Sequence, residues 1–226
     1  MATSIDQMVP TGDPGVRVAL DAAWQDAGQQ ILRGVAHALG NRVMTIATLA
    51  QLVRDAGGDA RAGDALASEA ERLDALLRNL RVLSAHDGGR EEPLDLEEIA
   101  REAAELLRRH ADVHGIAWRV ERRGAALPAW GDRALATRMV AVLLVAGARH
   151  ALRLGHREGV VEHAGDGTHR VLAVCVGASD GADDTAEAQG RAAGALAPAL
   201  CCRETARGAR YEVRFATLAE ARRLGW

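Results

Sequence analysis

The stretch ILRGVAHALGNRVMTIATLAQLV, residues 31–53, decides how the first part of the chain folds. Its apolar side chains recur at intervals of seven, with two more offset by three: Leu32, Leu39, Ile46 and Val53, then Val35 and Leu49. Such a repeat is typical of a long helix with one face packed against other helices. We therefore predict a helix over about residues 18–56, in which Arg42 interrupts the apolar stripe.

A second helix is expected over about residues 65–85. The segment DAGGDARAGD, residues 55–64, carries glycines that end the first helix, and Asp64 is placed to cap the next one. Leucines then repeat at helical spacing: Leu66, Leu73, Leu76, Leu80 and Leu83. Residues 18–86 thus form a hairpin with apolar faces too broad for two helices to bury, so we predict a homodimer built on a four-helix bundle.

The polar segment HDGGREEPLD contains glycine and proline and predicts a linker at residues 87–94. After it, the spacing of apolar residues indicates both helices and strands. Helices are expected from Asp95, which caps the first, and over residues 131–155. Strands are expected at 116–123, 159–164, 169–179, 199–205 and 209–218, with a short helix at 185–197. This order favours an α+β sandwich over residues 95–226 with its helices on one face. Residues 1–17 are expected to be a flexible lead-in.

Composition narrows the possible functions. The 226 residues carry 28 basic and 31 acidic side chains, a net charge of −3, so no strongly basic surface points to nucleic acid. All the basic residues are arginine, which excludes chemistry that needs lysine, including a Walker-type phosphate loop. Cys175, Cys201 and Cys202 lack metal-ligand spacing and are expected to be reduced thiols. With no signal-peptide layout and no membrane-length apolar run, we expect a cytoplasmic protein that does not bind membranes.

Three stretches, taken in order, resemble the core of bacterial histidine kinases. HALGNRV (residues 37–43) resembles the H box, PLDLEEIAREAAELLRRHADVHGIAWRV (93–120) the entry to the ATP-binding domain, and GDRALATRMVAVLLVAGARHAL (131–152) the helix with the N box. The resemblance covers about residues 27–218. It implies a dimerising hairpin with a phospho-accepting histidine, His37, followed by a domain of the ATP-binding type.

The departures from that family are selective. In those kinases an acidic residue follows the histidine, whereas this chain has Ala38 at that position. An asparagine of the N box helps those kinases to hold Mg²⁺, and the aligned residue here is Gly147. Ala178 replaces the aspartate of the adenine-binding segment, and GRAAGALAPAL (190–200) has alanines where close approach to phosphate needs glycine. We infer a degenerate domain that keeps the fold and has lost ATP, so no cofactor is expected.

His37 is expected to face solvent. At ~100° per residue it lies about 160° from Val35 and Leu39, and Asn41 is on its exposed side. A neutral imidazole can attack an aspartyl phosphate, which is an activated donor, and the receiver domain brings its own acidic residues and metal. The resemblance therefore implies a histidine phosphotransferase relaying phosphate between receiver domains, with His37 and Asn41 as catalytic residues.

Arg33 and Arg42 lie near His37, and we expect them to attract the acidic face of a receiver. Two other functions remain open. A non-catalytic dimeric adaptor would dock a kinase or a response regulator without carrying phosphate. A diverged kinase would need acidic residues of the segment after residue 177 to replace the missing groups: Asp180, Asp183 or Asp184.

The other histidines and the tryptophans are expected to be structural. His110 and His114 are four residues apart, a spacing that can hold a metal, but no third ligand is near and we predict surface histidines. Trp118 and Trp130 are expected in the core of the second domain. Trp24 is expected to close the top of the bundle.

Overall fold

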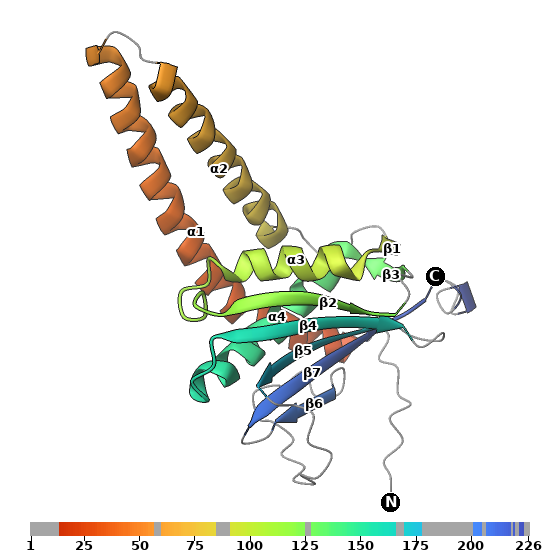
Figure 1. The fold of residues 1–226 in the computed structure, drawn as a ribbon. Coiled ribbons are helices and arrows are strands. Elements are labelled where there is room, and N and C mark those ends of the chain that lie inside the picture. The colour runs from red at the N-terminus through yellow and green to blue at the C-terminus, as the bar shows by residue number, and fades with distance from the viewer. Residues whose placement is uncertain are drawn as a thin grey trace, which may run out of the picture.

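The computed structural model describes residues 14–56, 60–84, 91–124, 128–165, 170–177, 201–204 and 207–217, together with 219, 222 and 223. Figure 1 shows a helical hairpin, α1 (Pro14–Ala56) and α2 (Ala60–Ser84), projecting from a unit of sheet and helix. That unit contains α3 (Leu96–Leu107) and α4 (Arg133–Arg153). Its strands are β1 (Glu91–Leu94), β2 (Ala117–Arg123), β3 (Ala129–Asp132), β4 (Glu158–Gly165), β5 (Arg170–Gly177), β6 (Cys201–Glu204) and β7 (Gly208–Phe215).

Helix α1 buries one stripe along its first half. The buried residues recur every three or four positions, as helical geometry requires: Leu20, Trp24, Ala27, Ile31 and Val35. This half packs on α4, whereas the second half of α1 packs on α2. The predicted heptad is wrong at Leu32, whose side chain is 50% exposed because it lies beside the buried Ile31 and off the stripe.

Helix α2 begins earlier than predicted. It starts at Ala60, so Asp64 is an exposed residue inside the helix and not its cap. Leu66 and Leu73 are half-buried and Leu76 is buried, which agrees with the predicted spacing. The side chains of Leu80 and Leu83 lie outside the described residues.

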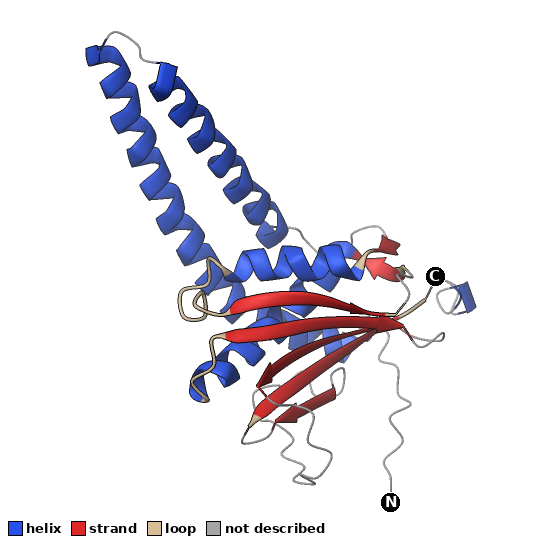
Figure 2. Cartoon of the chain, viewed as in Figure 1, coloured by secondary structure: helices blue, strands red, loops and turns tan. Residues whose placement is uncertain are grey.

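The second part of the chain is a layer of helices on one face of a sheet, as predicted (Figure 2). The five strands run in the order β2-β4-β5-β7-β6, with β2 and β4 parallel and the other neighbours antiparallel. Asp95 caps α3 as expected, because its Oδ1 accepts hydrogen bonds from the amides of Glu97 at 2.9 Å and Glu98 at 3.4 Å.

A second, two-stranded sheet was not predicted. Strand β1 pairs antiparallel with β3, and β1 lies within the stretch 87–94 that the sequence favoured as a linker. Its residues, EEPL, include two carboxylates and a proline, which are unfavourable in a strand. Among the described strands, β1 pairs with β3 alone, so Pro93, which has no N–H to donate, lies in an edge strand, where proline is tolerated.

The core lies between α4 and the sheet, where Leu143, Leu144, Leu172 and Tyr211 are at most 1% exposed. Trp118 packs against this core, as predicted. Trp24 does not close the top of the hairpin: it is buried at the contact with α4, with the guanidinium of Arg138 5.6 Å from its ring centre.

Trp130 is half-buried, and its indole N–H donates to Glu91 Oε2 at 3.2 Å, which ties β3 to β1. Among the described helices, α4 alone is long and apolar enough to cross a membrane, and 78% of its apolar window is buried inside the protein. That burial is what a core helix shows. The predicted helix at 185–197 lies outside the described residues.

Candidate functional site

His37 lies on the exposed side of α1, in agreement with the helical geometry. Its Nε2 is 3.3 Å from the amide nitrogen of Asn41, one turn further along. When that amide donates, Nε2 is the unprotonated nitrogen and Nδ1 carries the ring proton. In that tautomer, the lone pair of Nε2 is directed at the exposed amide of Asn41.

The residues next to His37 leave its ring without an acidic partner. Ala38 follows it and is half-buried against the core, so no carboxylate can orient the imidazole from that position. Arg33 is exposed and lies one turn before His37 on the same side of the helix. The side chain of His37 is therefore open to solvent, and the side chains of Arg33 and Asn41 on the same side of the helix are exposed as well.

The hairpin meets the sheet unit directly below His37. A Cβ atom on Gly34 would lie 1.5 Å from the carbonyl oxygen of Arg109, so the two backbones touch at this point. Lower on the same contact, Arg149 donates to Asp26 Oδ2 at 2.7 Å. Since His37 is three residues beyond Gly34, it lies about 4.5 Å further along the helix axis than this contact.

Arg42 is engaged inside the hairpin. Its Nη1 lies 3.0 Å from both carboxylate oxygens of Glu69 on α2, and Arg72 also contacts Glu69. Glu69 is only 4% exposed. Burial opposes its ionisation, but hydrogen bonds from Arg42 and then Arg72 outweigh this and hold the pKa of Glu69 below its ordinary value.

Sequence reasoning missed Glu69, although a signal was present. On α2 it falls on the same face as Leu66, Leu73 and Leu76, where an apolar residue is expected. On α1, Arg42 interrupts the apolar stripe in the same way. One basic and one acidic interruption on two helices of a hairpin indicate an ion pair across it. That Arg42 binds a partner stays a prediction. Any such contact must be compatible with the ion pair between Arg42 and Glu69.

We expect acid to weaken the hairpin through Glu69. Because its pKa is lower in the folded state, the ionised group stabilises the fold above about pH 4.5, and this stabilisation is lost as pH falls through the lowered value. Thermal unfolding followed by circular dichroism should show that Glu69→Gln is less stable than wild type at neutral pH. The difference should shrink as the pH falls below 4.5. Glu71→Gln, at an exposed position on the same helix, serves as control; an equal loss there would contradict the expectation.

The position compared with the kinase asparagine, Gly147, faces the sheet. A Cβ atom there would lie 2.8 Å from Val174 Cγ1 and 3.4 Å from Trp118 Cη2. An asparagine side chain has no room, so the residues present do not fit ATP held through this position. Its neighbour Ala146 is half-buried and also lacks an amide side chain. The other altered positions, Ala178 and 190–200, lie outside the described residues, as do the three aspartates of the kinase alternative.

Restoring the asparagine should therefore damage the fold and not confer nucleotide binding. We expect Gly147→Asn to lower the free energy of unfolding by about 2–4 kcal/mol, through overpacking and a buried amide without partners. Urea unfolding measures the loss, and calorimetry with Mg·ATP checks binding. Ala146→Asn, one position away and half-buried, should cost clearly less. A Gly147→Asn protein that is stable and binds Mg·ATP would contradict the expectation.

The pair His110 and His114 is not the predicted pair of surface histidines. His110 is fully buried and its Nδ1 accepts from the amide of Asp112 at 3.2 Å; burial lowers its pKa. His114 is exposed, with its Nδ1 3.0 Å from the carbonyl oxygen of Ala111. Over the described ranges, no group of three or more histidine, cysteine or acidic side chains could hold a metal ion.

No protein-family model and no curated protein sequence matches the chain. Among solved structures, it is similar to a histidine kinase from Burkholderia phymatum STM815, with 15% identity, 90% of this chain and 98% of that chain covered, and a TM-score of 0.44. For the Acinetobacter baumannii histidine kinase AdeS, the identity is 15%, the match covers 80% of this chain and 98% of that chain, and the TM-score is 0.39. For the cytoplasmic segment of histidine kinase QseC, the identity is 14%, the match covers 65% of this chain and 94% of that chain, and the TM-score is 0.36. These identities and scores are too low to assign a function, which has to rest on the residues of the chain itself.

Proposed function

We propose that the protein is a histidine phosphotransferase of two-component signalling, which carries a phosphoryl group on His37 between receiver domains and does not use ATP. The observation that carries the proposal is the exposed imidazole, whose Nε2 lies 3.3 Å from the Asn41 amide. A second observation supports the absence of ATP chemistry: α4 packs on the sheet at Gly147 so closely that a magnesium-binding side chain has no space there.

The transfer needs little from the acceptor. The Nε2 lone pair attacks the phosphorus of the receiver's aspartyl phosphate, a nitrogen–phosphorus bond forms, and the bond from phosphorus to the aspartate oxygen breaks. The ring proton stays on Nδ1, and the carboxylate remains on the receiver. The reverse step passes the group to a second receiver. Because the donor is already activated, no neighbouring base is required, which suits Ala38.

Asn41 gives the acceptor its orientation. At rest its amide occupies the Nε2 lone pair, and both side chains are exposed and can separate when a receiver approaches. The freed amide then lies within one helical turn of the phosphoryl oxygens and can donate to them. Arg33, on the same side, supplies a positive charge toward an acidic receiver surface.

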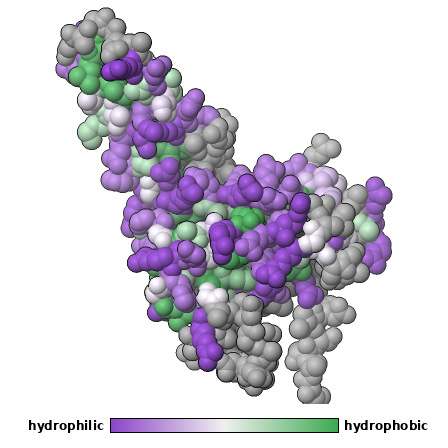
Figure 3. All heavy atoms as spheres, viewed as in Figure 1, coloured by the Kyte–Doolittle hydropathy of each residue, from purple (hydrophilic) through white to green (hydrophobic). Residues whose placement is uncertain are grey.

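The partners in this proposal are receiver domains of response regulators or of a hybrid kinase, in the cytoplasm, and a second copy of the chain. The hairpin leaves large apolar side chains exposed, namely Leu32, Val43, Met44, Leu52 and Leu77. Figure 3 shows apolar atoms at the surface of the hairpin among polar ones. A four-helix bundle formed by two hairpins would cover part of them.

The dimer can be tested at Leu52, near the outer end of α1. Its side chain is 54% exposed, so a charge there should leave the single chain folded. If the bundle buries it, Leu52→Asp removes about 1.5–3 kcal/mol of apolar burial per copy and should weaken the dimer at least about tenfold. Sedimentation equilibrium measures the change. Gln51→Asp, an exposed neighbour, provides the charge control; equal weakening by both variants, or a monomeric wild type, would refute the predicted bundle.

The function is tested by mixing the protein with purified receivers labelled on their aspartate. We expect the label to move to the protein and to be acid-labile and base-stable, as phosphohistidine is. An adaptor would bind the receiver and take no label. A diverged kinase would be labelled directly by Mg·ATP without a receiver. Either of these two results would reject the phosphotransferase.

A further inference from the structure

An arginine of the sheet unit lies beside the part of α1 that carries the proposed acceptor. Arg109 follows the end of α3, and its backbone contacts α1 at Gly34. A Cβ atom on Gly34 would lie 3.3 Å from the Cα of Arg109. Figure 1 shows this end of α3 next to α1. Two segments that are far apart in sequence thus place a basic residue close to His37.

Helical geometry limits the distance between Arg109 and His37. The Cβ atoms of residues three apart on a helix are about 5–6 Å from each other, which applies to positions 34 and 37. Adding the 3.3 Å from Gly34 to Arg109 places the Cα of Arg109 within about 9 Å of the Cβ of His37. An extended arginine side chain covers about 6 Å of this distance, as standard bond lengths require. Its guanidinium is therefore within reach of a group bound to the His37 ring.

The guanidinium of Arg109 is unpaired within the part of the chain that the structure describes. The side chain is half-buried, and its Nε is buried without a hydrogen-bond partner. The terminal nitrogens, Nη1 and Nη2, form no hydrogen bond and no ion pair with the described residues. An arginine in this state keeps its donors for another acceptor, and half-buried arginines without any partner need an explanation.

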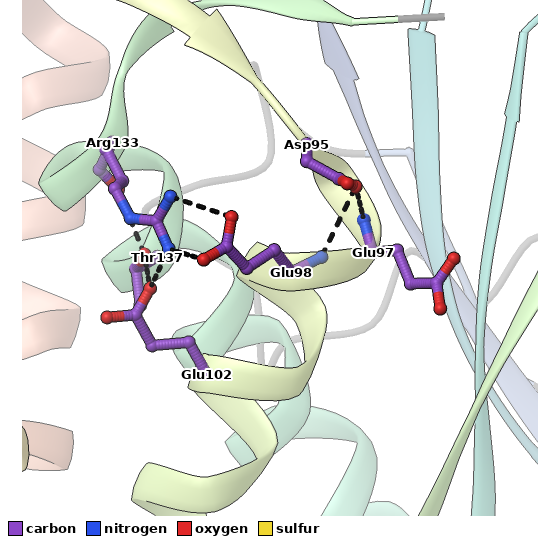
Figure 4. Close-up of polar contacts among 6 residues, drawn as sticks. All are labelled: Asp95, Glu97, Glu98, Glu102, Arg133 and Thr137. Atoms are coloured by element: carbon purple, nitrogen blue, oxygen red, sulfur yellow. Dashed lines mark hydrogen bonds and ion pairs between the residues drawn. The ribbon is translucent and has the colours of Figure 1, made fainter. Parts of the chain in front are cut away.

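The carboxylates around Arg109 do not neutralise it. All four glutamates of α3 contact other arginines: Glu97 contacts Arg101, Glu105 contacts Arg108, and Glu98 and Glu102 contact Arg133 (Figure 4). On α1, Asp26 accepts a hydrogen bond from Arg149 at 2.7 Å. Asp112, shortly after Arg109, is exposed and forms no ion pair with a described residue, so water and salt screen its charge.

The backbone of Arg109 is held in place by the packing of α3. Asp95 caps the first turn of α3, and Arg133 joins this helix to α4, which in turn packs on α1 (Figure 4). At the other end of α3, Leu107 is 1% exposed. Because each of these elements contacts the next, Arg109 has a defined position relative to His37, which a residue that contacts a reacting group requires.

We propose that Arg109 binds the phosphoryl group carried by His37 and is a further catalytic residue of the transfer, an inference that rests on the proposed function. The terminal nitrogens donate to the phosphoryl oxygens, whose geometry matches the fork of a guanidinium. The positive charge stabilises the negative charge that these oxygens carry while the nitrogen–phosphorus bond forms. Along α1, Asn41 lies one turn beyond His37 and Arg109 contacts the turn before it, so the two donors approach the group from different directions.

The contact can be tested without any receiver, by chemical phosphorylation of the full chain. Potassium phosphoramidate transfers its phosphoryl group to exposed histidines and releases ammonia. In protein labelled with ¹⁵N-arginine, the Nε–H signal that is missing from Arg109→Lys belongs to Arg109. We expect this signal to shift when wild type is phosphorylated, because the guanidinium gains charge-assisted hydrogen bonds, and to stay unchanged when His37→Ala is treated in the same way.

The contribution to transfer is measured with a labelled receiver over a range of concentrations. We expect Arg109→Gln to lower the maximal rate at least about tenfold and to leave the apparent KM nearly unchanged, since the contact forms with the transferred group. Arg109→Lys should recover part of the rate. Arg108→Gln, which removes an exposed arginine paired with Glu105, should transfer as wild type does. Circular dichroism verifies that each variant is folded.

Each outcome separates this inference from the proposed function. The role of Arg109 is overturned if phosphorylation of His37 leaves the Arg109 signal unchanged, if Arg109→Gln transfers as fast as wild type, or if Arg108→Gln loses as much activity. A wild type that takes no label from any receiver refutes the phosphotransfer instead. Chemical phosphorylation needs no receiver, so the NMR result decides in either case whether Arg109 contacts the phosphoryl group.

Discussion

His37→Ala should abolish the transfer of label from a phosphorylated receiver, by at least about 1,000-fold relative to wild type. The reason is that the substitution removes the atom that forms the bond to phosphorus, and the neighbouring side chains, Ala38 and Asn41, have no nucleophile to replace it. Rapid-quench measurements of label on the protein give the rate. Because His37 is exposed, the variant should remain folded, and its unfolding curve should follow that of wild type.

Two matched variants make this result specific. His114→Ala removes another exposed histidine and should transfer at the wild-type rate. Asn41→Ala keeps the nucleophile but removes the orienting amide, so we expect a loss of about tenfold, which is the magnitude of one hydrogen bond. Label that persists on His37→Ala, or that disappears with His114→Ala, would place the acceptor elsewhere.

Gly34→Ala should lower the free energy of unfolding by about 3 kcal/mol or more, the largest stability loss expected for a single added methyl group in α1. The new Cβ would lie 1.5 Å from the carbonyl oxygen of Arg109. Since the obstacle is backbone and not a flexible side chain, α1 must move away from the sheet unit. Denaturation with urea measures the loss, and Trp24, buried at the contact with α4, should become more exposed.

The control lies on the same helix. Gly40 has nothing within 4 Å of a Cβ atom and is exposed, so Gly40→Ala gains helix propensity without a clash. We expect it to stabilise the protein by about 0.5–1 kcal/mol. If Gly34→Ala instead stabilises the protein as much as Gly40→Ala, α1 does not dock on Arg109 as described.

The sequence was sufficient for the elements whose pattern is local. The helix α1, the aspartate before α3 and the strands β2, β4, β5 and β7 each follow from neighbouring residues, and the structure confirms them. The exposure of His37 also follows from its distance in residues from Val35.

The errors concern contacts between distant parts of the chain. Strand β1 exists because β3 pairs with it, and Leu32 is exposed because the buried stripe of α1 runs through Ile31 and Val35. Neither the pairing nor the position of the stripe can be predicted from a local pattern. The same applies to the pairing of Arg42 with Glu69 and to the burial of His110, which the sequence presented as a surface residue.

The continuity of α1 determines what surrounds the proposed acceptor. One uninterrupted helix of 43 residues is anchored to the sheet unit at Gly34 and carries His37 a single turn beyond that anchor. The backbone of Arg109, in the segment between α3 and β2, therefore lies about one helical turn below the level of His37 along α1. A receiver domain that docks on His37 from this side would contact both the helix and this segment, so residues far in sequence from the histidine can contribute to partner selection.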